Sequence, residues 1–242
     1  MGLSLKNKVV LPHDHPSQRR HDRLYFALTN HCNRSCPWCS VFSSPEKSSF
    51  LSIEKFKSLL PQDAPFEVQL EGGEPTVHPH FLDFVKVVRE QPQCSLLVIC
   101  TNAVLFPREK NRLEAYLEKL GKPLLLKISV NHHLLERDPG LLELLQKIHQ
   151  WAEHNNDCDL VINVRRRKNS KDEDRTITEK LKALDLLKIS NDFYLQRYGL
   201  AKNEMSWDLP FAVKDQFLMV NPDGEIFDGD LIKRSEAMGA LK

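Results

Sequence analysis

Short apolar runs alternate along this chain with longer amphipathic stretches, in which apolar residues recur every three or four positions. The short runs predict strands and the amphipathic stretches predict helices. The predicted strands are 24–29, 66–70, 96–101, 124–130, 160–164 and 193–198. The predicted helices have their apolar faces within 53–60, 81–88, 113–120, 141–151 and 177–187.

Several helix boundaries carry local signals. Ser52 is a predicted N-cap for the first helix, and Asp138 followed by Pro139 predicts the start of the fourth. Gly121 and Pro123 predict the end of the third helix.

Five helices that separate six strands require a parallel sheet, because each connection is long enough for a right-handed crossover. Six strand–helix units are too few for a closed eight-stranded barrel. The predicted fold class is therefore α/β, a partial (βα)6 TIM-like barrel with a short C-terminal β-hairpin extension; a doubly wound sheet is the alternative. The expected domains are a polar leader (1–23), the barrel core (24–200) and a C-terminal extension (201–242), whose hairpin turns at 221–224.

Polar residues occupy one alternation face of four predicted strands, whereas parallel strands buried on both faces are usually apolar throughout. These stripes are Glu67/Gln69/Glu71, Lys127/Ser129/Asn131, Asn163/Arg165 and Tyr194/Gln196/Tyr198. We expect them to line a wet, ligand-holding interior; a salt-bridged core without a ligand is the alternative.

The overall charge is nearly balanced, with Lys+Arg 34 against Asp+Glu 33 and a net charge of +1. We therefore expect no general attraction to nucleic acid or to anionic membranes. No apolar run reaches the length of a membrane span or signal peptide, so a reducing, cytoplasmic location is expected for the 6 cysteines.

Three cysteines, Cys32, Cys36 and Cys39, fall within one eight-residue segment directly after the first predicted strand. This spacing indicates a metal or redox site rather than a disulfide framework. Three thiolates are one short of the four that normally hold an iron–sulfur cluster, so one iron would stay open to another ligand. A structural zinc site with His31 or another histidine as fourth ligand is the alternative.

The spacing Cys32-x-x-x-Cys36-x-x-Cys39, together with Gly72-Gly73-Glu74-Pro75 after the second strand, resembles the radical S-adenosylmethionine (SAM) superfamily. The flanking segment 28–33 looks like the branch with SPASM or twitch extensions. The resemblance implies a [4Fe–4S] cluster bound by the three cysteines and SAM bound at its open iron. It also implies a 5′-deoxyadenosyl radical that abstracts hydrogen from the substrate, and an external electron donor of the flavodoxin or ferredoxin type.

The resemblance further implies a set of SAM-binding residues. Gly72 and Gly73 would let the backbone approach the methionine moiety, and Glu74 or the adjacent carbonyls would accept from its ammonium group. Trp38 would lie beside the adenine or simply pack. The remaining candidates follow later strands: Asn102, Ser129 for the ribose, Asn131 where relatives have an acid, and Arg137 or Arg165 for the carboxylate.

No cysteine follows Cys158, so we expect no auxiliary cluster and a redox-neutral outcome, such as rearrangement or epimerisation of a polar small molecule or peptide. Cys100 shares a predicted strand face with Asn102 and could return a hydrogen atom to a substrate radical; a buried hydrophobe is the alternative. The sequence is also compatible with a viperin-like nucleotide enzyme, a deazapurine-forming enzyme, a zinc-stapled binding module or a homologue that binds SAM without cleaving it.

Overall fold

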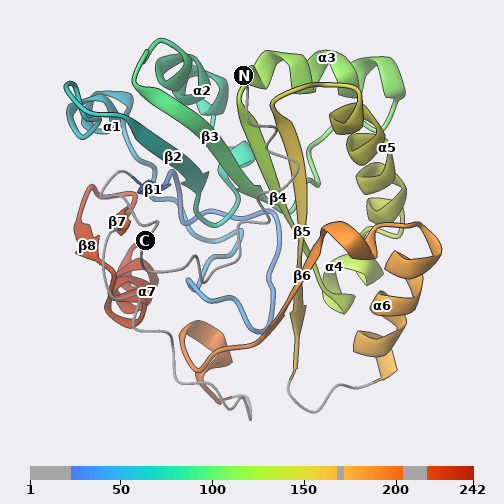
Figure 1. Cartoon of the computed structure of the whole chain (residues 1–242). Coiled ribbons are helices and arrows are strands. Elements are labelled where there is room, and N and C mark those ends of the chain that lie inside the picture. The colour runs from blue at the N-terminus through green and yellow to red at the C-terminus, as the bar shows by residue number, and fades with distance from the viewer. Residues whose placement is uncertain (1–22, 168–171, 204–216) are drawn as a thin grey trace, which may run out of the picture.

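The computed structural model describes residues 23–167, 172–203 and 217–242. The predicted leader (1–23) lies outside this part of the chain except for Arg23, which begins the first strand. The described strands form one eight-stranded sheet in the order β6-β5-β4-β3-β2-β1-β7-β8, and a ring of helices flanks it (Figure 1).

Most strands begin and end within two residues of the predicted positions. Their bounds are β1 Arg23–Ala27, β2 Phe66–Glu71, β3 Cys94–Thr101, β4 Leu124–Val130, β5 Cys158–Arg166, β6 Ser190–Tyr194, β7 Phe217–Val220 and β8 Ile226–Asp228. The longer helices are α1 Ile53–Ser58, α2 Phe81–Arg89, α3 Lys110–Leu120, α4 His132–Arg137, α5 Leu141–Glu153, α6 Asp172–Ala183 and α7 Leu231–Ala240.

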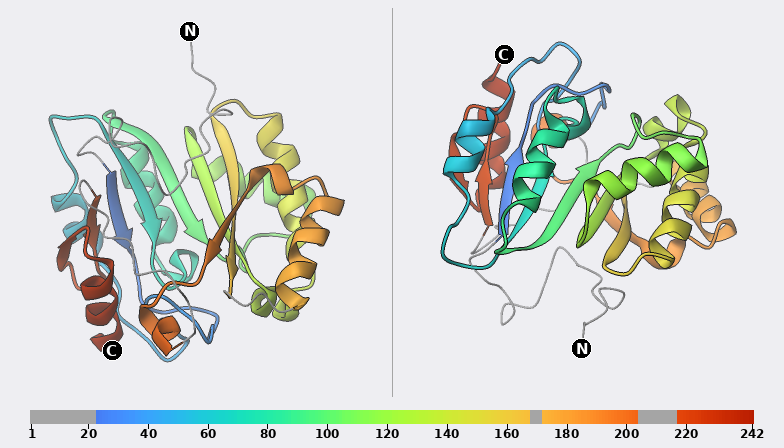
Figure 2. Two further views of the ribbon diagram at one scale, coloured as in Figure 1. Left: turned by 60° about the horizontal axis from the view of Figure 1, so that its bottom comes forward. Right: turned by 90° about the horizontal axis from the view of Figure 1, so that it is seen from above.

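Strands β1 to β6 are consecutive in the sheet and each pairs in parallel with the next. A doubly wound sheet would reverse its strand order partway, and this one does not. Helices α1, α2, α3, α5 and α6 lie along the outer side of the curved sheet (Figure 2). The open partial barrel predicted from the sequence is therefore confirmed.

The main hydrophobic core fills the layer between the sheet and these helices. Outward strand residues such as Phe26, Leu70 and Ile128 are fully buried there against helix residues such as Phe84 and Leu145. Burial of this outer layer leaves the opposite, inner face of the sheet available for polar side chains.

Two predicted helix ends are confirmed and one is wrong. The Ser52 side chain accepts a hydrogen bond from the Lys55 backbone N–H, and Gly121 ends α3 with φ +70°. The fourth predicted helix, however, begins at Leu141 with Gly140 as its cap. Asp138 instead ends the short helix α4, which the sequence pattern did not predict, and its carboxylate lies 2.5 Å from Arg108.

Strand β6 begins and ends earlier than predicted, and its alternation is opposite. Phe193 pairs with Arg165, whose guanidinium carbon lies 4.8 Å from the phenyl ring centroid. Tyr194 is 51% exposed and ends the strand, so Gln196 and Tyr198 lie beyond it. The predicted polar stripe on this strand is therefore wrong.

The predicted C-terminal hairpin forms, and it extends the main sheet. β7 pairs in parallel with β1, with Phe26 opposite Val220, and in antiparallel fashion with β8. The following helix α7 then packs beside the loop that carries the three cysteines (Figure 1).

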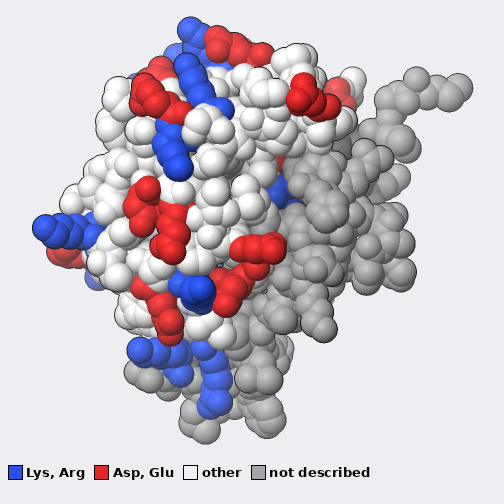
Figure 3. Space-filling view, turned by 90° about the vertical axis from the view of Figure 1, so that its left-hand side faces the viewer, with Lys and Arg blue, Asp and Glu red and all other residues white. Residues whose placement is uncertain are grey.

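No helix in the described residues is long and apolar enough to cross a membrane. On the face that holds α1, β8 and α7, basic and acidic side chains of the described residues are interspersed (Figure 3). This distribution agrees with the balanced net charge.

Candidate active site

The three cysteines lie in the loop between β1 and α1, at the carboxyl end of the parallel strands. Backbone hydrogen bonds close the loop: the Cys32 N–H donates to Ser44 at 3.1 Å and the Cys39 N–H donates to Cys36 at 3.1 Å. The Ser43 N–H lies 3.3 Å from Cys39 Sγ. Active sites of parallel α/β barrels gather at this end of the strands.

Burial raises the pKa of all three thiols, to about 12 for Cys32 and about 11 for Cys36. The neighbouring thiols raise the pKa of Cys32 and of Cys36 further, so the three sulfur atoms lie within electrostatic reach of one another. A bound cation would offset this cost, because it stabilises thiolates that burial disfavours.

The arrangement of these thiols does not match a site for a single metal ion. Within the described residues no group of three or more His, Cys, Asp or Glu side chains is close enough to hold one ion. Tetrahedral zinc with Zn–S bonds of about 2.3 Å requires sulfur atoms only about 3.8 Å apart. A wider trio suits a cluster in which each thiolate binds a different iron.

Four unpaired buried polar atoms in the same loop also fit a bound group. Asn33 Nδ2, Arg34 Nε, Trp38 Nε1 and Ser43 Oγ have no hydrogen-bond partner within the described structure. Buried polar atoms rarely stay unpaired, so several in one loop point to a ligand that is not protein. The donor set and its setting therefore fit an iron–sulfur cluster with a small polar cofactor.

Gly72 and Gly73 bring the loop after β2 against the cysteine loop. The Gly73 N–H donates to Thr29 at 2.7 Å and the Glu74 N–H donates to His31 at 3.0 Å. A Cβ atom on either glycine would overlap the Thr29 or His31 carbonyl oxygen, and Gly72 has φ +144°. We predicted that these glycines admit the methionine moiety of SAM; in the structure they are required for contact between the two loops.

Glu74 is fully buried and its carboxylate joins the ends of β2 and β3. One oxygen accepts from Thr76 Oγ1 at 2.6 Å and Thr101 Oγ1 at 2.5 Å, and the other from the Asn102 N–H at 2.7 Å. Burial raises its pKa despite these donors. Both carboxylate oxygens are therefore engaged by the protein, and the backbone carbonyls of the segment are the better acceptors for an ammonium group.

Asn102 lies beside the cysteines, as predicted for a cofactor-binding residue. Its amide nitrogen donates to Asn33 Oδ1 at 2.8 Å and lies 3.9 Å from Cys32 Sγ. Asn131, in contrast, caps α4: its Oδ1 accepts from the Leu134 N–H at 2.9 Å. Ser129 lies on the inner face of β4, level with Asn163 of β5.

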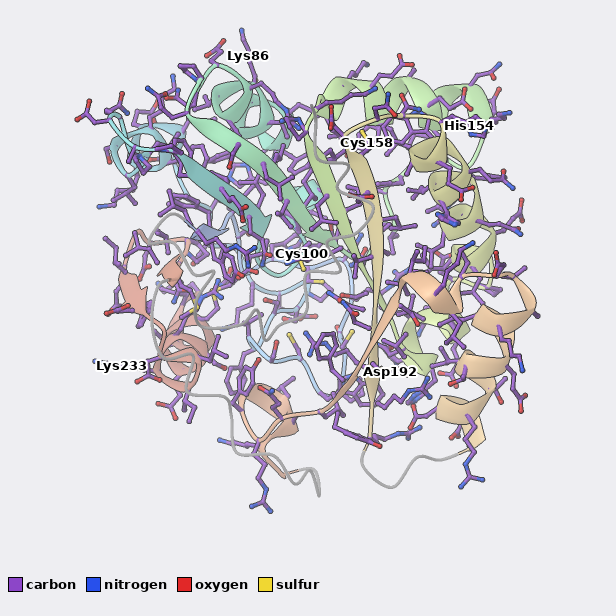
Figure 4. The ribbon with its side chains drawn as sticks, in the orientation of Figure 1. Lys86, Cys100, His154, Cys158, Asp192 and Lys233 are labelled. Carbon is purple, nitrogen blue, oxygen red and sulfur yellow. The ribbon has the colours of Figure 1, made fainter. Side chains whose placement is uncertain are left out.

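The structure separates the two candidate arginines. Arg137 is exposed at the end of α4, whereas Arg165 lies on the inner face of β5. The charges of Lys127 and Arg165 both lower the pKa of Cys100, although burial raises it overall to about 11. Arg165 is thus the arginine that faces the interior, with Cys100 at the centre of the sheet (Figure 4).

Trp38 is buried with its ring centroid 4.8 Å from that of His132, and the Arg167 guanidinium lies 5.7 Å from its ring. Arg167 also pairs with Asp174 at 3.0 Å, and Arg166 binds Asp192 at 2.6 Å. These two arginines, which the sequence suggested as free anion ligands, are therefore already paired within the described residues.

The polar stripes predicted on β2 and β4 are confirmed. Lys127 Nζ donates to Gln69 Oε1 at 3.0 Å, and the Gln69 amide donates to Glu71. Glu71 then pairs with Arg234 of α7 at 2.6 Å. This chain of contacts links α7 to the interior of the barrel.

Sequence patterns missed the contribution of α7. Arg234 is 5% exposed and donates to Asn221 Oδ1 at 3.2 Å as well as to Glu71. On the other side of the helix, Lys47 Nζ donates to the Gly239 carbonyl at 2.8 Å, and Ser235 Oγ donates to the Ser40 carbonyl at 2.5 Å. The cysteine loop is thus held partly by residues about 190 positions away, a separation of 195 in the last case.

No family model matches the chain. The GTP 3′,8-cyclase of Chlorobaculum tepidum is 29% identical over 95 residues, which cover 38% of this chain and 29% of that enzyme. The antilisterial bacteriocin subtilosin biosynthesis protein AlbA of Bacillus subtilis is 31% identical over 99 residues, which cover 39% of this chain and 22% of that protein. The matched segments thus span about a third or less of these relatives.

Solved structures share the fold at low sequence identity. Streptococcus suis SuiB bound to its precursor peptide SuiA aligns with a TM-score of 0.58 and 15% identity, over 85% of this chain and 58% of SuiB. The enzyme anSMEcpe with bound AdoMet aligns with a TM-score of 0.56 and 13% identity, over 72% of this chain and 51% of that one. The motifs, the relatives and the fold together confirm the predicted resemblance of this chain to the radical SAM superfamily.

Proposed function

We propose that this chain is a radical SAM enzyme in which Cys32, Cys36 and Cys39 bind three irons of a [4Fe–4S] cluster and SAM occupies the fourth. The observation that carries the proposal is the cysteine loop itself: three buried thiols held against the Gly72-Gly73 loop at the carboxyl end of a partial barrel. The cluster and SAM together supply a 5′-deoxyadenosyl radical that takes a hydrogen atom from the substrate.

The surrounding residues hold this site rigid and dry. Glu74 fixes the Gly72-Gly73 loop to the end of β3, and Asn102 bonds to the cysteine loop next to Cys32. Residues that are locked by their own hydrogen bonds keep reacting groups within the narrow geometry that catalysis requires.

For SAM itself we propose contacts on three sides. The carbonyls of Gly72 and Gly73 accept from its ammonium group, Trp38 lies beside its adenine, and Ser129 meets its ribose. Arg165, on the inner face, binds its carboxylate in preference to the exposed Arg137. The Trp38 Nε1, which is buried without a partner in the described residues, supplies a further donor.

We propose a polar small molecule or peptide as substrate. AlbA takes part in bacteriocin biosynthesis and SuiB binds a precursor peptide, which supports a peptide; the similarity to GTP 3′,8-cyclases supports a nucleotide as the second candidate. A precursor peptide encoded beside this gene would decide for the first.

Epimerisation is the redox-neutral outcome that the interior favours, because Cys100 lies on the inner face beside Lys127. Its S–H bond would break as a substrate C–H bond forms. The resulting thiyl radical would then take one electron from an external donor of the flavodoxin or ferredoxin class and one proton from solvent.

Anaerobic incubation with dithionite and SAM tests the proposal. Wild-type protein should release 5′-deoxyadenosine, the Cys36→Ser variant should release none, and the Cys94→Ser variant, whose cysteine lies at the opposite end of the sheet, should match wild type. A protein that binds SAM but releases no 5′-deoxyadenosine under these conditions is the non-cleaving homologue instead.

A further inference from the structure

A cleft opens on the inner face of the sheet, with an apolar floor and polar walls. Leu96, Val98 and Leu125 form its floor and belong to a small buried cluster separate from the main core. Its walls include Tyr25, Gln69 and Lys127. A cleft of this kind can hold a ligand that has both an apolar part and a polar group.

Lys127 is the cation of this cleft without an acidic partner among the described residues. Arg23, which also lines the cleft, pairs with Glu67 at 2.6 Å. The Lys127 ammonium donates to the neutral Gln69 amide and forms no ion pair with the described residues. Glu71, the nearest acid in the same hydrogen-bond chain, is already paired with Arg234.

An ammonium group in this position is costly. Burial lowers the pKa of Lys127, which shows that the surroundings disfavour its charge. A charge withdrawn from water is normally paired, and a positive one is stabilised by an anion. The protein thus presents a cation whose counter-charge has to come from a bound molecule.

The position of Lys127 points to the substrate rather than to SAM. Lys127 pairs in register with Cys100, whereas Ser129, proposed for the SAM ribose, is level with Asn163 nearer the cysteine loop. Two residues of strand place Lys127 about 6.6 Å deeper in the barrel. An anion bound there lies beneath the proposed radical site.

We infer that the cleft binds a substrate that carries a carboxylate or phosphate group, with this anionic group on Lys127 and an apolar part over Leu96, Val98 and Leu125. The inference rests on the proposed function only for its statement that the ligand is the substrate. It narrows the polar substrate proposed above to an anionic one.

The alkylation rate of Cys100 reports on this cleft, because Cys100 neighbours Lys127. Cys158 is 3% exposed at the far end of the sheet and serves as an internal reference for unfolding (Figure 4). The probes are butyrate, butylphosphonate and the neutral butyramide, and site-resolved rates with iodoacetamide are read by peptide mass spectrometry. No cluster is needed, so failure of this test is separate from failure of the proposed function.

We expect butyrate or butylphosphonate, but not butyramide, to slow alkylation of Cys100 while Cys158 stays protected. Lys127→Gln should weaken the anion's apparent affinity about tenfold or more, since a charged contact is lost. Lys188→Gln, which removes an exposed lysine, should leave the affinity unchanged. Equal protection by butyramide, no protection by any probe, or full protection in Lys127→Gln would overturn the inference.

Two further measurements keep the test decisive. If Lys127→Gln unfolds and exposes Cys158, Lys127→Arg replaces it and should retain anion binding with the same preference over butyramide. In reconstituted protein saturated with SAM, butyrate should still bind, as followed by its effect on the melting temperature. Loss of that binding would assign the cation to the SAM carboxylate and contradict a substrate site.

Discussion

Replacing Gly73 by alanine should separate the two loops that form the active site, and it should do so before any cofactor is bound. The added Cβ would overlap the His31 carbonyl and would also lie 2.9 Å from the Asn30 carbonyl oxygen. These neighbours are backbone atoms, so they cannot turn aside as a flexible side chain could.

The magnitude follows from the contacts that would be lost. The Gly73 N–H bond to Thr29 at 2.7 Å and the Glu74 N–H bond to His31 at 3.0 Å both require the close approach. Two such bonds contribute about 2 kcal/mol together, and a forced backbone shift costs about 1–3 kcal/mol. We therefore expect Gly73→Ala to lower the free energy of unfolding by about 3–5 kcal/mol.

Urea unfolding of cluster-free protein measures this loss, with Gly140→Ala as the matched control. A Cβ at Gly140 would meet only Asp138 Oδ1, at 3.8 Å, so that variant should stay within about 0.5 kcal/mol of wild type. If Gly73 served only to admit SAM, Gly73→Ala would weaken SAM binding and leave the cluster-free protein as stable as wild type. That result would refute the reasoning.

Three other changes test neighbouring contacts. Arg234→Met should cost about 3–5 kcal/mol in urea unfolding, because it leaves the buried Glu71 carboxylate without its partner; an unchanged midpoint would show that the pair does not stabilise the fold. Thr101→Val keeps the side-chain shape but removes a donor to Glu74, and should cost about 1–3 kcal/mol in the same assay. Lys127 has a folded-state pKa below its unfolded value of 10.5, so the unfolded chain binds more protons between the two values and stability rises with pH there. The stability of wild type relative to Lys127→Met, measured by urea unfolding from pH 8 to 10.5, should therefore increase with pH; a flat difference would contradict the burial of this ammonium.

Local patterns predicted most of the barrel because its elements depend on local residues. Strand β4 has the predicted bounds, since its apolar run is set off by Pro123 and the polar Asn131. Ser52 caps α1 because its hydroxyl meets a backbone N–H three residues on, a contact that needs no tertiary partner.

The errors arise where local signals compete or where partners are distant. Asn131 and Asp138 are both good capping residues, and the sequence alone did not show that the first begins a short helix which the second ends. In β6, the side that faces inward is set by pairing of Phe193 with Arg165, and both alternations are possible for a strand at the sheet edge.

The candidate site was predicted in composition but not in assembly. Spacing alone identified the cysteines and the Gly72-Gly73 loop, because the chemistry requires those residues close together in sequence. It could not show that Arg234 reaches Glu71, since that contact depends on parallel pairing of β7 with β1 across nearly the whole chain. The signal that could have found it is an arginine two turns after a predicted hairpin, which is too common to be decisive.

Iron and acid-labile sulfide content after anaerobic reconstitution tests the central claim most directly. Wild-type protein and the Cys94→Ser variant should each bind about four irons and four sulfides per chain, whereas Cys32→Ser, Cys36→Ser and Cys39→Ser should each lose most of both. One equivalent of zinc with no sulfide in wild type, or full iron content in all three serine variants, would contradict the account.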